Sequence, residues 1–423
     1  MMMNFAKLDL SDLYFGFAFF YPLFMAWIWI AGGIWFYFKR EYRQNDLPEP
    51  SEEGCSIIIP CFNEEEQAHA TIRYAMQTQY PLFEVIAVND GSSDKTAEIL
   101  DELAAQYPKL RVVHLAENQG KAYALRAGTM VSQYEFLVCI DGDALLHPHA
   151  VFWMMHHLTS FPRVGAVTGN PRIINRSSIL GKLQVGEFSS IIGLIKRAQR
   201  TYGRIFCVSG AIAGFRKTAL DRIGYWSADM ITEDIDVSWR LQFDHWDLQY
   251  VPKALCYIYM PETFKGLWKQ RLRWSQGGVE VLFAHVRKMF KWRLRRMWPI
   301  AIEAMISIAW AYVIFGIFLL YLYGLFFPVP TEWYIQTIIP QWYGVILGVT
   351  CLIQFLVSLA IDHQYDKSRT FRTYFWVIWY PLFFWILMML TSVVSLPKTI
   401  FKKQKRARWV SPDRGFRGED EHA

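Results

Sequence analysis

The stretch Phe136-Leu137-Val138-Cys139-Ile140-Asp141-Gly142-Asp143 decides the fold class of this chain. Five apolar residues typical of a buried strand lead directly into two carboxylates that are separated by one glycine. Similar apolar runs occur upstream at 56–59, 85–88 and 112–115, with helical patterns near 64–78, 94–106 and 120–132. This alternation predicts an α/β domain with an open, mostly parallel sheet that is covered by helices on both faces.

Acidic residues gather directly after the predicted strands. The segment 60–65 follows the first strand, Asp90 follows the second, and Asp141 and Asp143 follow the fourth. Each motif alone is more often a turn or a loop. Open α/β sheets bind ligands at the carboxyl ends of their strands, so we expect these acids to share one cleft. Mg²⁺ and Mn²⁺ prefer such oxygen ligands and share them with substrate phosphates, so Asp141 and Asp143 are candidate metal ligands.

A further acidic cluster, Thr232-Glu233-Asp234, lies later in the chain with Asp236 behind it. A carboxylate that takes the proton of an attacking alcohol typically contributes ~10²–10⁴-fold to the rate, so one of these acids is a candidate general base. The alternative is a helix cap, in which Thr232 and the acids begin a helix that runs through 237–240. Both roles can coexist.

The motif Gln270-Arg271-Leu272-Arg273-Trp274 combines basic and aromatic side chains. Arginine can hold a diphosphate through paired, charge-assisted hydrogen bonds, and tryptophan offers a flat apolar face with one N–H donor. The alternative is a basic amphipathic helix at a membrane surface. The segments 181–200 and 264–274 are both predicted to be amphipathic helices, either at a membrane interface or on the surface of a soluble domain.

Hydrophobic residues make up 53% of the chain and are concentrated before residue 40 and after residue 298. Residues 13–38 carry no charge and are long enough to cross a hydrocarbon core of roughly 30 Å. Basic residues follow directly, which places the C-terminal end of this anchor inside. Three further apolar stretches lie at 300–327, 342–361 and 374–396.

The C-terminal region presents a conflict of topology. Three full spans that start inside would leave the C-terminus outside, yet residues 398–423 form a strongly basic tail. Basic clusters beside spans usually mark the cytoplasmic side, where anionic lipids are found. Either the last stretch, which Pro381 interrupts, is re-entrant, or the positive-inside rule fails at this end.

Charge and cysteine content exclude other classes of protein. The net charge of +6 comes from basic clusters beside the apolar stretches, so nucleic acid is not an expected partner. The six cysteines lack the close pairing of a metal site, and most lie in apolar runs. We expect them to be buried, reduced thiols of a cytoplasmic domain.

The series Asp90, Asp141-Gly142-Asp143, Thr232-Glu233-Asp234 and 270–274, followed by membrane spans, resembles the processive family-2 glycosyltransferases. That family includes the cellulose, chitin and hyaluronan synthases. The resemblance implies a glycosyltransferase A-type, Rossmann-like cytoplasmic domain attached to an α-helical transmembrane region. It also implies a UDP-sugar donor, a growing polysaccharide as acceptor, and an inverting transfer without a covalent intermediate.

The resemblance further assigns roles to single residues. It implies that Asp143, with Asp141 beside it, holds Mg²⁺ or Mn²⁺. It implies that Asp234 is the general base and that Glu233 is its catalytic neighbour.

The remaining roles in the cleft concern the two substrates. The resemblance implies acceptor contacts from Gln270 and Trp274, on the helix that covers the diphosphate. It implies nucleotide-sugar contacts from Asp90, Lys121, Asp141 and Arg273.

Within the family, four stretches resemble the branch that polymerises β-1,6-linked N-acetyl-D-glucosamine: 88–96, 165–172, 193–197 and 404–412. This implies UDP-GlcNAc as the donor and a biofilm exopolysaccharide as the product. It also implies a multi-pass protein of the bacterial inner membrane that passes the polymer through the lipid bilayer. A small membrane partner, with cyclic-di-GMP at the shared interface, is implied in the same way.

Three alternatives remain beside this interpretation. The chain could be another family-2 synthase, or it could transfer a single sugar to a lipid phosphate. It could also be a non-catalytic polysaccharide channel or a cyclic-dinucleotide receptor. The complete set of acidic motifs favours an enzyme.

The domain organisation that we expect has five parts. They are an N-terminal anchor (1–43, span 13–38), a cytoplasmic glycosyltransferase domain (51–262), interfacial helices (263–298), a transmembrane region (299–397) and a basic tail (398–423).

Overall fold

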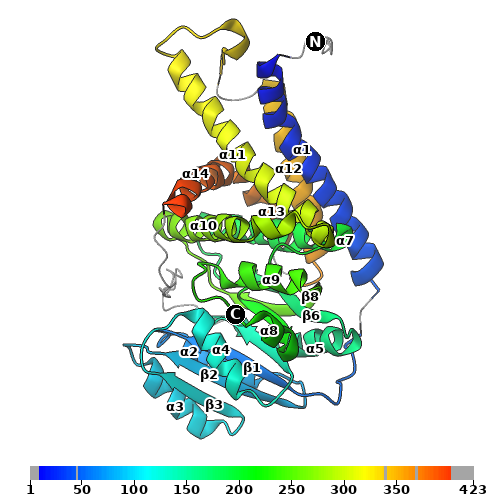
Figure 1. The fold of residues 1–423 in the computed structure, drawn as a ribbon, viewed down its shortest axis with the longest axis vertical. Helices are drawn as coiled ribbons and strands as arrows, with labels where there is room; N and C mark the ends of the chain where they lie inside the picture. The colour runs from blue at the N-terminus through cyan, green and yellow to red at the C-terminus, as the bar shows by residue number, and fades with distance from the viewer. Residues whose placement is uncertain (1–8, 44–45, 338–340, 367–369, 402–423) are drawn as a thin grey trace.

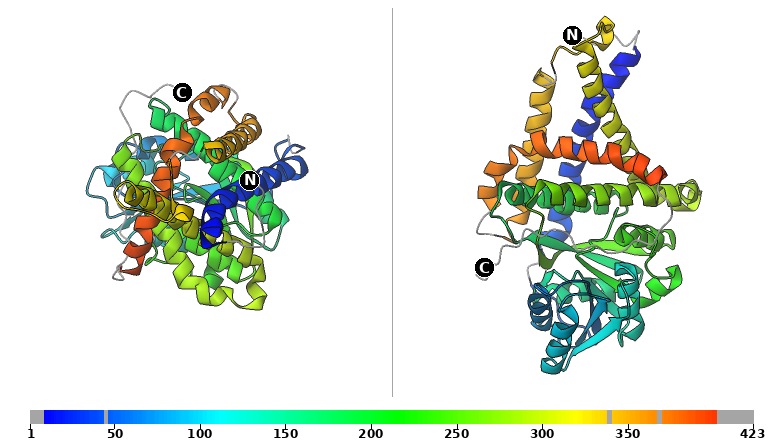
Figure 2. Two further views of the ribbon diagram at one scale, coloured as in Figure 1. Left: turned by 90° about the horizontal axis from the view of Figure 1, so that it is seen from above. Right: turned by 90° about the vertical axis from the view of Figure 1, so that its left-hand side faces the viewer.

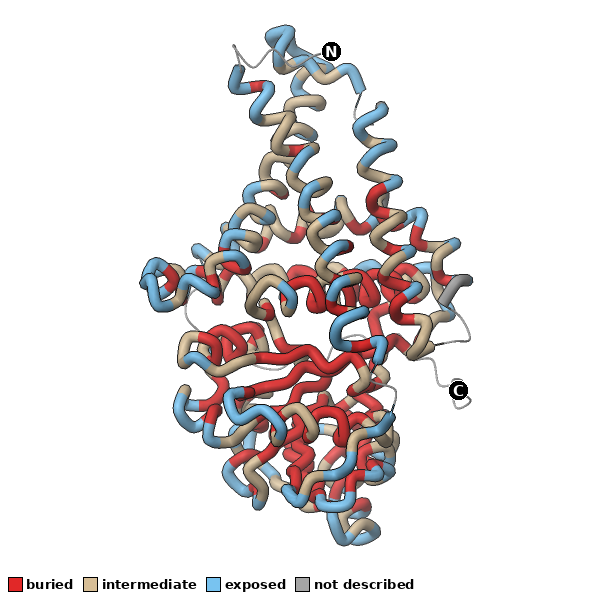
Figure 3. Tube along the Cα trace, turned by 90° about the vertical axis from the view of Figure 1, so that its right-hand side faces the viewer, coloured by how far each residue is buried: buried red, intermediate tan, exposed pale blue. Residues whose placement is uncertain are grey.

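The computed structural model describes residues 9–43, 46–337, 341–366 and 370–401. It has three levels, which Figure 1 shows from bottom to top. A sheet domain forms one end of the molecule, a layer of helices lies across it, and long apolar helices rise from that layer. Figure 3 shows that buried residues are concentrated in the sheet and the helical layer, whereas the upright helices are largely exposed.

An eight-stranded sheet forms the centre of the domain, in the order β3-β2-β1-β4-β7-β6-β8-β5. The strands are β1 (Cys55–Cys61), β2 (Phe83–Asp90), β3 (Leu110–Leu115), β4 (Phe136–Ile140), β5 (Leu145–Leu146), β6 (Val164–Ile173), β7 (Ile212–Arg216) and β8 (Asp247–Ile258). β1 to β4 pair in parallel, as do β6 and β8, whereas β7 runs antiparallel to both of its neighbours. The prediction of a mostly parallel sheet is confirmed, and its four apolar runs fall within β1 to β4.

Helices cover both faces of this sheet, because successive side chains of a strand point to opposite faces. In β1, Ile57 and Ile59 join a core with α2 (Ala68–Met76), α3 (Thr96–Gln106) and α5 (Ala150–Ser160). Ile58 joins the opposite core with α4 (Lys121–Val131), α8 (Lys217–Ile223) and α9 (Glu233–Phe243). All seven residues of β1 are buried, as expected for a central parallel strand.

The helical layer contains two long runs. One is continuous from α6 (Ile179–Glu187) through the π-helical segment η3 (Phe188–Ile195) to α7 (Lys196–Tyr202), and the other is α10 (Phe264–Met289). The first run contacts β6 and β8 on one side and α12 and α13 on the other. Most of its residues are therefore buried, so the expected amphipathic helix is sandwiched between two levels of the protein.

Among the described residues, four helices have the length and apolar composition of a membrane span: Leu10–Glu41, Trp292–Gly324, Trp342–Asp362 and Phe383–Ile400. They correspond to α1 (Leu10–Phe36) with η2 (Tyr37–Glu41), η4 (Trp292–Met297) with α11 (Trp298–Gly324), α12 (Gln341–Asp362) and α14 (Tyr380–Ile400). A short helix, η5 (Thr331–Trp333), follows α11, and α13 (Thr370–Val377) precedes α14.

α14 differs from the other three in direction. α1, α11 and α12 stand upright together, whereas α14 crosses them and lies along α10 (Figures 1 and 2). The stretch 374–396, which was expected as one span, is divided between α13 and α14. Proline disfavours helical conformation in the residue before it but fits a first turn, and Pro381 lies in the first turn of α14. Residues 402–423, most of the predicted basic tail, lie outside the described residues.

A buried group of charges, which we call the ion network, joins the levels. Arg197 of α7 donates to both oxygens of Glu41, at 2.7 and 2.8 Å, and lies 3.1 Å from Asp362 at the end of α12. Arg172 of β6 donates to the other oxygen of Asp362 at 2.6 Å. All four side chains are nearly inaccessible to solvent. The two arginines and two carboxylates balance, so the network locks α1, α7, β6 and α12 together.

Candidate active site

Three segments far apart in sequence meet at the carboxyl edge of the sheet. Lys121 is the first residue of α4, Asp141 follows β4 directly, and Glu233 is the first residue of α9. The ammonium of Lys121 lies 2.5 Å from Asp141 Oδ1 and 3.1 Å from Glu233 Oε1. It also donates to the carbonyl of Gly210 at 3.3 Å. One lysine thus links the two acidic motifs that the sequence suggested would share a cleft.

The charge of this lysine is maintained by its neighbours. Burial by itself disfavours an ammonium, but Asp141 and Glu233 together raise the pKa of Lys121 above its ordinary value. Lys121 is therefore a permanent cation in the cleft. It can partly offset the repulsion between the carboxylates, and it can attract an anionic substrate.

Glu233 and Asp234 are adjacent, but their environments move their pKa values in opposite directions. Burial alone would raise the pKa of Glu233, yet the ion pair with Lys121 holds it below its usual value. Burial and the neighbouring charge of Glu233 raise the pKa of Asp234, although Lys121 and Arg273 oppose this. A carboxylate with a raised pKa is the stronger base, so this pair offers one fixed anion and one proton acceptor.

Asp141 and Asp143 lie side by side at the end of β4. Burial, together with the charges of Asp143 and Glu233, raises the pKa of Asp141 to about 6, although Lys121 acts in the other direction. The carboxylate of Asp141 is thus held in a site that repels further negative charge. A proton and a metal ion therefore compete for the Asp141 carboxylate, and the metal must bind strongly to displace the proton.

Two glycines allow the segments to approach so closely. A Cβ on Gly210 would lie 3.1 Å from Asp234 Oδ2 and 3.3 Å from Lys121 Nζ. A Cβ on Gly277 of α10 would lie 2.1 Å from Thr232 Oγ1, a distance that real atoms do not adopt. Glycine at position 277 therefore lets α10 pack directly on the residue that precedes Glu233.

The helix cap proposed for Thr232 is formed only in part. Thr232 occupies the N-cap position of α9, but its side chain makes no capping hydrogen bond. Asp236 has a separate structural role, because it accepts hydrogen bonds from Ser227 at 2.6 Å and Arg240 at 2.7 Å and pairs with His285 of α10 at 2.8 Å. The first turn of α9 thus carries two acids of the cleft, Glu233 and Asp234, and a third, Asp236, that holds α9 to α10.

The motif 270–274 divides between two sides of α10. Arg273 is exposed, and its charge lowers the pKa of both Glu233 and Asp234, so it faces the acidic cleft. Arg271 points the other way and is fully buried, with Nη2 2.5 Å from Glu187 of α6. Only one of the two arginines is therefore available to a substrate.

Gln270 and Trp274 lie in the same helix, but among the described residues their side-chain contacts are with residues other than the acids of the cleft. The amide of Gln270 donates to the sulfur of Met260 at 3.8 Å. The ring of Trp274 lies against Phe188, with ring centroids 6.3 Å apart, and the Arg271 guanidinium stacks on it at 4.3 Å. The Trp274 ring is half-buried and held in place by these neighbours.

Asp90 contributes to the cleft through the backbone of the loop that precedes Lys121. Its two oxygens accept hydrogen bonds from the backbone N–H groups of Gln119 and Gly120, both at 2.8 Å. The carboxylate is completely buried, and burial raises the pKa of Asp90 despite these hydrogen bonds. Asp90 therefore holds the loop that ends at Lys121.

Two residues that the sequence did not single out for chemistry also adjoin Asp234. Cys207 lies beside it, and Lys196 acts electrostatically on both Cys207 and Asp234. Lys196 is buried, donates to Thr168 at 3.1 Å, and has its pKa lowered by burial to about 8. Lys196 lies in the stretch 193–197 that carried the family resemblance and in the predicted amphipathic helix 181–200, and neither signal indicated a place in the cleft.

Comparison with known proteins agrees with this geometry. Residues 52–277 match the family described as glycosyltransferase like family 2. Poly-beta-1,6-N-acetyl-D-glucosamine synthase of Staphylococcus epidermidis is 38% identical over 95% of this chain and 98% of its own length. The protein of the same name from Staphylococcus aureus (strain COL) is 39% identical over the same shares of the two chains.

A solved structure supports the fold assignment. The mannosyltransferase of Pyrobaculum calidifontis, in complex with GDP-Man and Mn²⁺, has a TM-score of 0.62 and covers 93% of this chain and 99% of its own. Its sequence is 19% identical, so the likeness concerns the fold alone. The matched domain, the relatives of nearly equal length and the sheet topology agree, and the chain belongs to the family 2 glycosyltransferases.

Proposed function

We propose that this glycosyltransferase polymerises N-acetyl-D-glucosamine from UDP-GlcNAc into a β-1,6-linked chain. The observation that supports the proposal is the junction of Lys121 with Asp141 and Glu233, which brings the two acidic motifs into one cleft. The sugar and the linkage follow from the relatives named above, which match nearly the whole chain.

In this proposal Asp234 is the general base of an inverting transfer. Its raised pKa supports this role, because the acid can accept a proton from the attacking hydroxyl more readily than Glu233 can. Glu233 stays ionised in its pair with Lys121 and keeps that lysine in place. The hydroxyl oxygen forms the new bond to the anomeric carbon while the bond to the UDP oxygen breaks.

Asp143 and Asp141 would hold a divalent cation, Mg²⁺ or Mn²⁺. The residues fit such an ion, since their oxygens lie in a cleft where carboxylates outnumber cationic side chains. No cluster of three or more His, Cys, Asp or Glu is arranged as a metal site within the described residues, so the remaining ligands would be water and phosphate oxygens. When bound, the ion would neutralise the charge that develops on the departing diphosphate.

The nucleotide-sugar and the acceptor would lie on either side of Asp141 and Asp143. Asp90 holds the loop at 118–120 for the nucleotide, and Lys121 and Asp141 adjoin the diphosphate. Arg273 would bind the phosphates from α10, while Gln270 and Trp274 would contact the acceptor end. The buried partners of Trp274 support this assignment, because a fixed aromatic ring is a suitable platform for a sugar.

We further infer that α1, α11 and α12 cross the bacterial inner membrane and that α14 lies at its cytoplasmic interface. With three crossings, the N-terminus of α1 is outside, and the sheet domain and the C-terminus are both inside. Three crossings would leave Lys398, at the start of the basic tail, on the cytoplasmic side, as the positive-inside rule expects. The polymer would pass between the upright helices beside α10.

A small membrane partner, with cyclic-di-GMP at the shared interface, belongs to the same proposal. It rests on the family resemblance. Co-purification of the chain from its native membrane, followed by identification of any stoichiometric small subunit, tests it.

The decisive experiment supplies the purified protein in lipid vesicles with single UDP-sugars and either Mg²⁺ or Mn²⁺. We expect a long polymer from UDP-GlcNAc alone, with β-1,6 linkages on chemical analysis and no synthesis after chelation of the metal. A polymer from another UDP-sugar would replace the sugar assignment. A glycolipid that carries one sugar would replace polymerisation, and no product from any donor would support a non-catalytic channel or receptor.

A further inference from the structure

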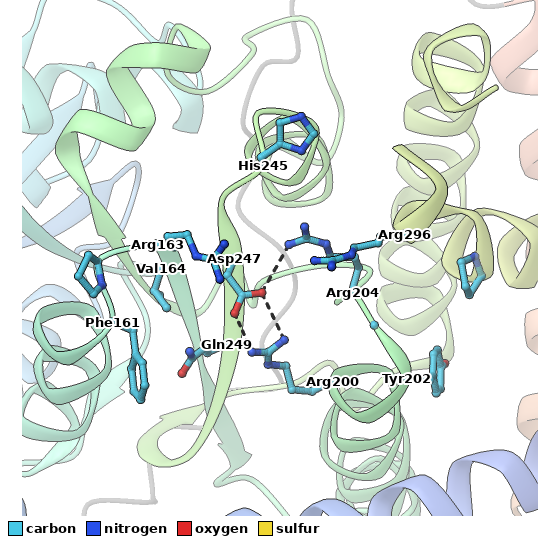
Figure 4. A pocket seen from close by; sticks show the side chains of 13 residues that line it. Phe161, Arg163, Val164, Arg200, Tyr202, Arg204, His245, Asp247, Gln249 and Arg296 are labelled. Atoms are coloured by element: carbon cyan, nitrogen blue, oxygen red, sulfur yellow. Dashed lines mark hydrogen bonds and ion pairs between the residues drawn. The ribbon is translucent and has the colours of Figure 1, made fainter. Parts of the chain in front are cut away.

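A second polar pocket lies at the opposite edge of the sheet from the active site. It has a volume of about 500 Å³ and is formed by the start of β6, the start of β8, the end of α7 and the entry to α11 (Figure 4). The acids of the active site follow the carboxyl end of β4, and β6 runs parallel to that strand through its antiparallel pairing with β7. None of the proposed site residues lines this pocket.

The pocket has an excess of positive charge. Arg163, Arg200, Arg204 and Arg296 line it together with a single carboxylate, that of Asp247. Arg200 donates to both Asp247 oxygens, at 2.7 and 3.3 Å, and Arg204 lies 3.4 Å from one of them. Asp247 therefore offsets one of the four arginine charges.

The surplus arginines remain close to one another. Burial, together with Arg296, Arg200 and Arg163, lowers the pKa of Arg204, although Asp247 opposes this. Arg163 and Arg296 form no ion pair with a carboxylate among the described residues, and Arg200 Nε is buried without a hydrogen-bond partner there. Repelling guanidinium groups in one concave site are stabilised by an anion that accepts paired hydrogen bonds, and phosphate has this geometry.

The position of the pocket identifies the source of the phosphate. Arg296 and Pro299 stand at the end of α11 that faces the sheet domain, where the apolar helix begins. Tyr202, also in the lining, donates to Glu303 within that helix at 2.9 Å. Phe161 and the nearby Trp292 are exposed, as aromatic residues often are at a membrane interface. A lipid whose acyl chains lay beside α11 would bring its headgroup to the level of Arg296 and Pro299.

We propose that this pocket binds the phosphodiester headgroup of an anionic phospholipid, which is held by Arg163, Arg204 and Arg296. Basic pockets between helices on the cytoplasmic side of a membrane are suited to such headgroups. The volume lies in the ~300–1,000 Å³ range of ligand sites. The bound lipid fixes the junction of α7, β8 and α11 at the membrane surface, and this inference does not depend on the sugar that the enzyme transfers.

The test compares two double variants that remove the same charge. R163Q/R296Q removes pocket arginines, and R287Q/R293Q removes exposed arginines of the same interfacial region that lie outside the pocket. Each full-length protein is reconstituted in vesicles of phosphatidylcholine and phosphatidylglycerol and extracted in detergent, and the retained lipid is measured by mass spectrometry. We expect wild type and R287Q/R293Q to retain phosphatidylglycerol. R163Q/R296Q should lose affinity on the order of fivefold for each arginine, the effect of one basic residue near an anionic surface.

Two further arms keep the test decisive. R163K/R296K preserves charge but removes the paired hydrogen bonds, so it should retain lipid at an intermediate level and with an unchanged melting temperature. Glycerophosphoglycerol and cyclic-di-GMP, added as soluble phosphodiesters at the same concentration as the lipid, should not displace it, because they lack the acyl chains. Equal loss in both glutamine variants overturns the pocket, and displacement by a soluble phosphodiester overturns the lipid as its occupant.

Discussion

The cleft and the ion network both consist of largely buried charged side chains, but they differ in balance. In the network, Arg172 and Arg197 meet the carboxylates of Glu41 and Asp362, and the charges cancel. In the cleft, four carboxylates stand against three cationic side chains, those of Lys121, Lys196 and the exposed Arg273. A balanced group is complete within the fold, whereas an unbalanced group is completed by a ligand. The difference separates the group that joins the levels of the fold from the proposed active site.

The largest expected effect comes from removing the base. Asp234→Asn should lower the rate of polymer synthesis by roughly 10²–10⁴-fold, because the amide cannot accept the proton of the acceptor hydroxyl. UDP binding should persist, since Asp234 makes no pair with the nucleotide in this assignment. Polymer yield and UDP binding by calorimetry measure the two outcomes. Asp229→Asn, an exposed acid before α9, is the control, and undiminished synthesis in D234N would remove Asp234 from its role.

The second prediction unbalances the ion network. Arg197→Met should reduce the free energy of unfolding by about 3–5 kcal/mol, because Glu41 and Asp362 would remain buried with one partner fewer. The melting temperature of the detergent-solubilised protein is the measurement. Arg222→Met breaks an exposed pair with Asp244 and should cost at most about 1 kcal/mol. Equal shifts in melting temperature in the two variants would show that the buried network stabilises the fold no more than an exposed ion pair does.

The third prediction disturbs the contact behind the cleft. Gly277→Ala places a methyl group where Thr232 already lies, so α9 or α10 must shift, at a cost of about 1–3 kcal/mol. Synthesis should fall with stability, because Glu233 and Asp234 move with Thr232. Gly278→Ala is the matched control, since its Cβ would meet nothing nearer than Phe206 at 3.9 Å. Similar activity in the two variants would contradict the close packing at position 277.

The smallest effect concerns pH. Lys121 lowers the pKa of both Glu233 and Asp234, so Lys121→Met should raise both values. The base must be deprotonated to act, so the acid limb of the rate profile should move to higher pH, by about one unit for a lost charge at this distance. Rates measured across the acid range test this. Lys109→Met, before β3 at the opposite edge of the sheet, should leave the limb in place, and a shift to lower pH in K121M would reverse the assigned sign.

Much of this architecture could be predicted from short stretches of sequence. The runs at 56–59, 85–88, 112–115 and 136–140 predicted β1 to β4, because a buried parallel strand is apolar along its whole length. The apolar stretches likewise predicted α1, α11 and α12. The direction of α14 could not be predicted this way, since composition does not record whether an apolar helix crosses the others or lies along α10.

The acids at 141, 143, 233 and 234 stood out by motif, and the family resemblance named Asp234 as the base and Glu233 as its neighbour. The pairing of Lys121 with Glu233 and the raised pKa of Asp234, on which the proposed division of roles rests, could be seen only in the structure. The motif by itself did not separate Arg271 from Arg273. The family resemblance named Arg273 for the nucleotide-sugar, and the structure leaves Arg273 exposed and Arg271 buried against Glu187.

By itself, then, the order of residues determined the strands β1 to β4, the class of sheet and the list of acids, because these depend on local periodicity and on neighbours along the chain. The tertiary structure alone decided which charges are matched and which are left over. Burial and pairing are set by side chains more than a hundred residues apart, such as Lys121 with Glu233 or Glu41 with Arg197, and no local pattern encodes their meeting.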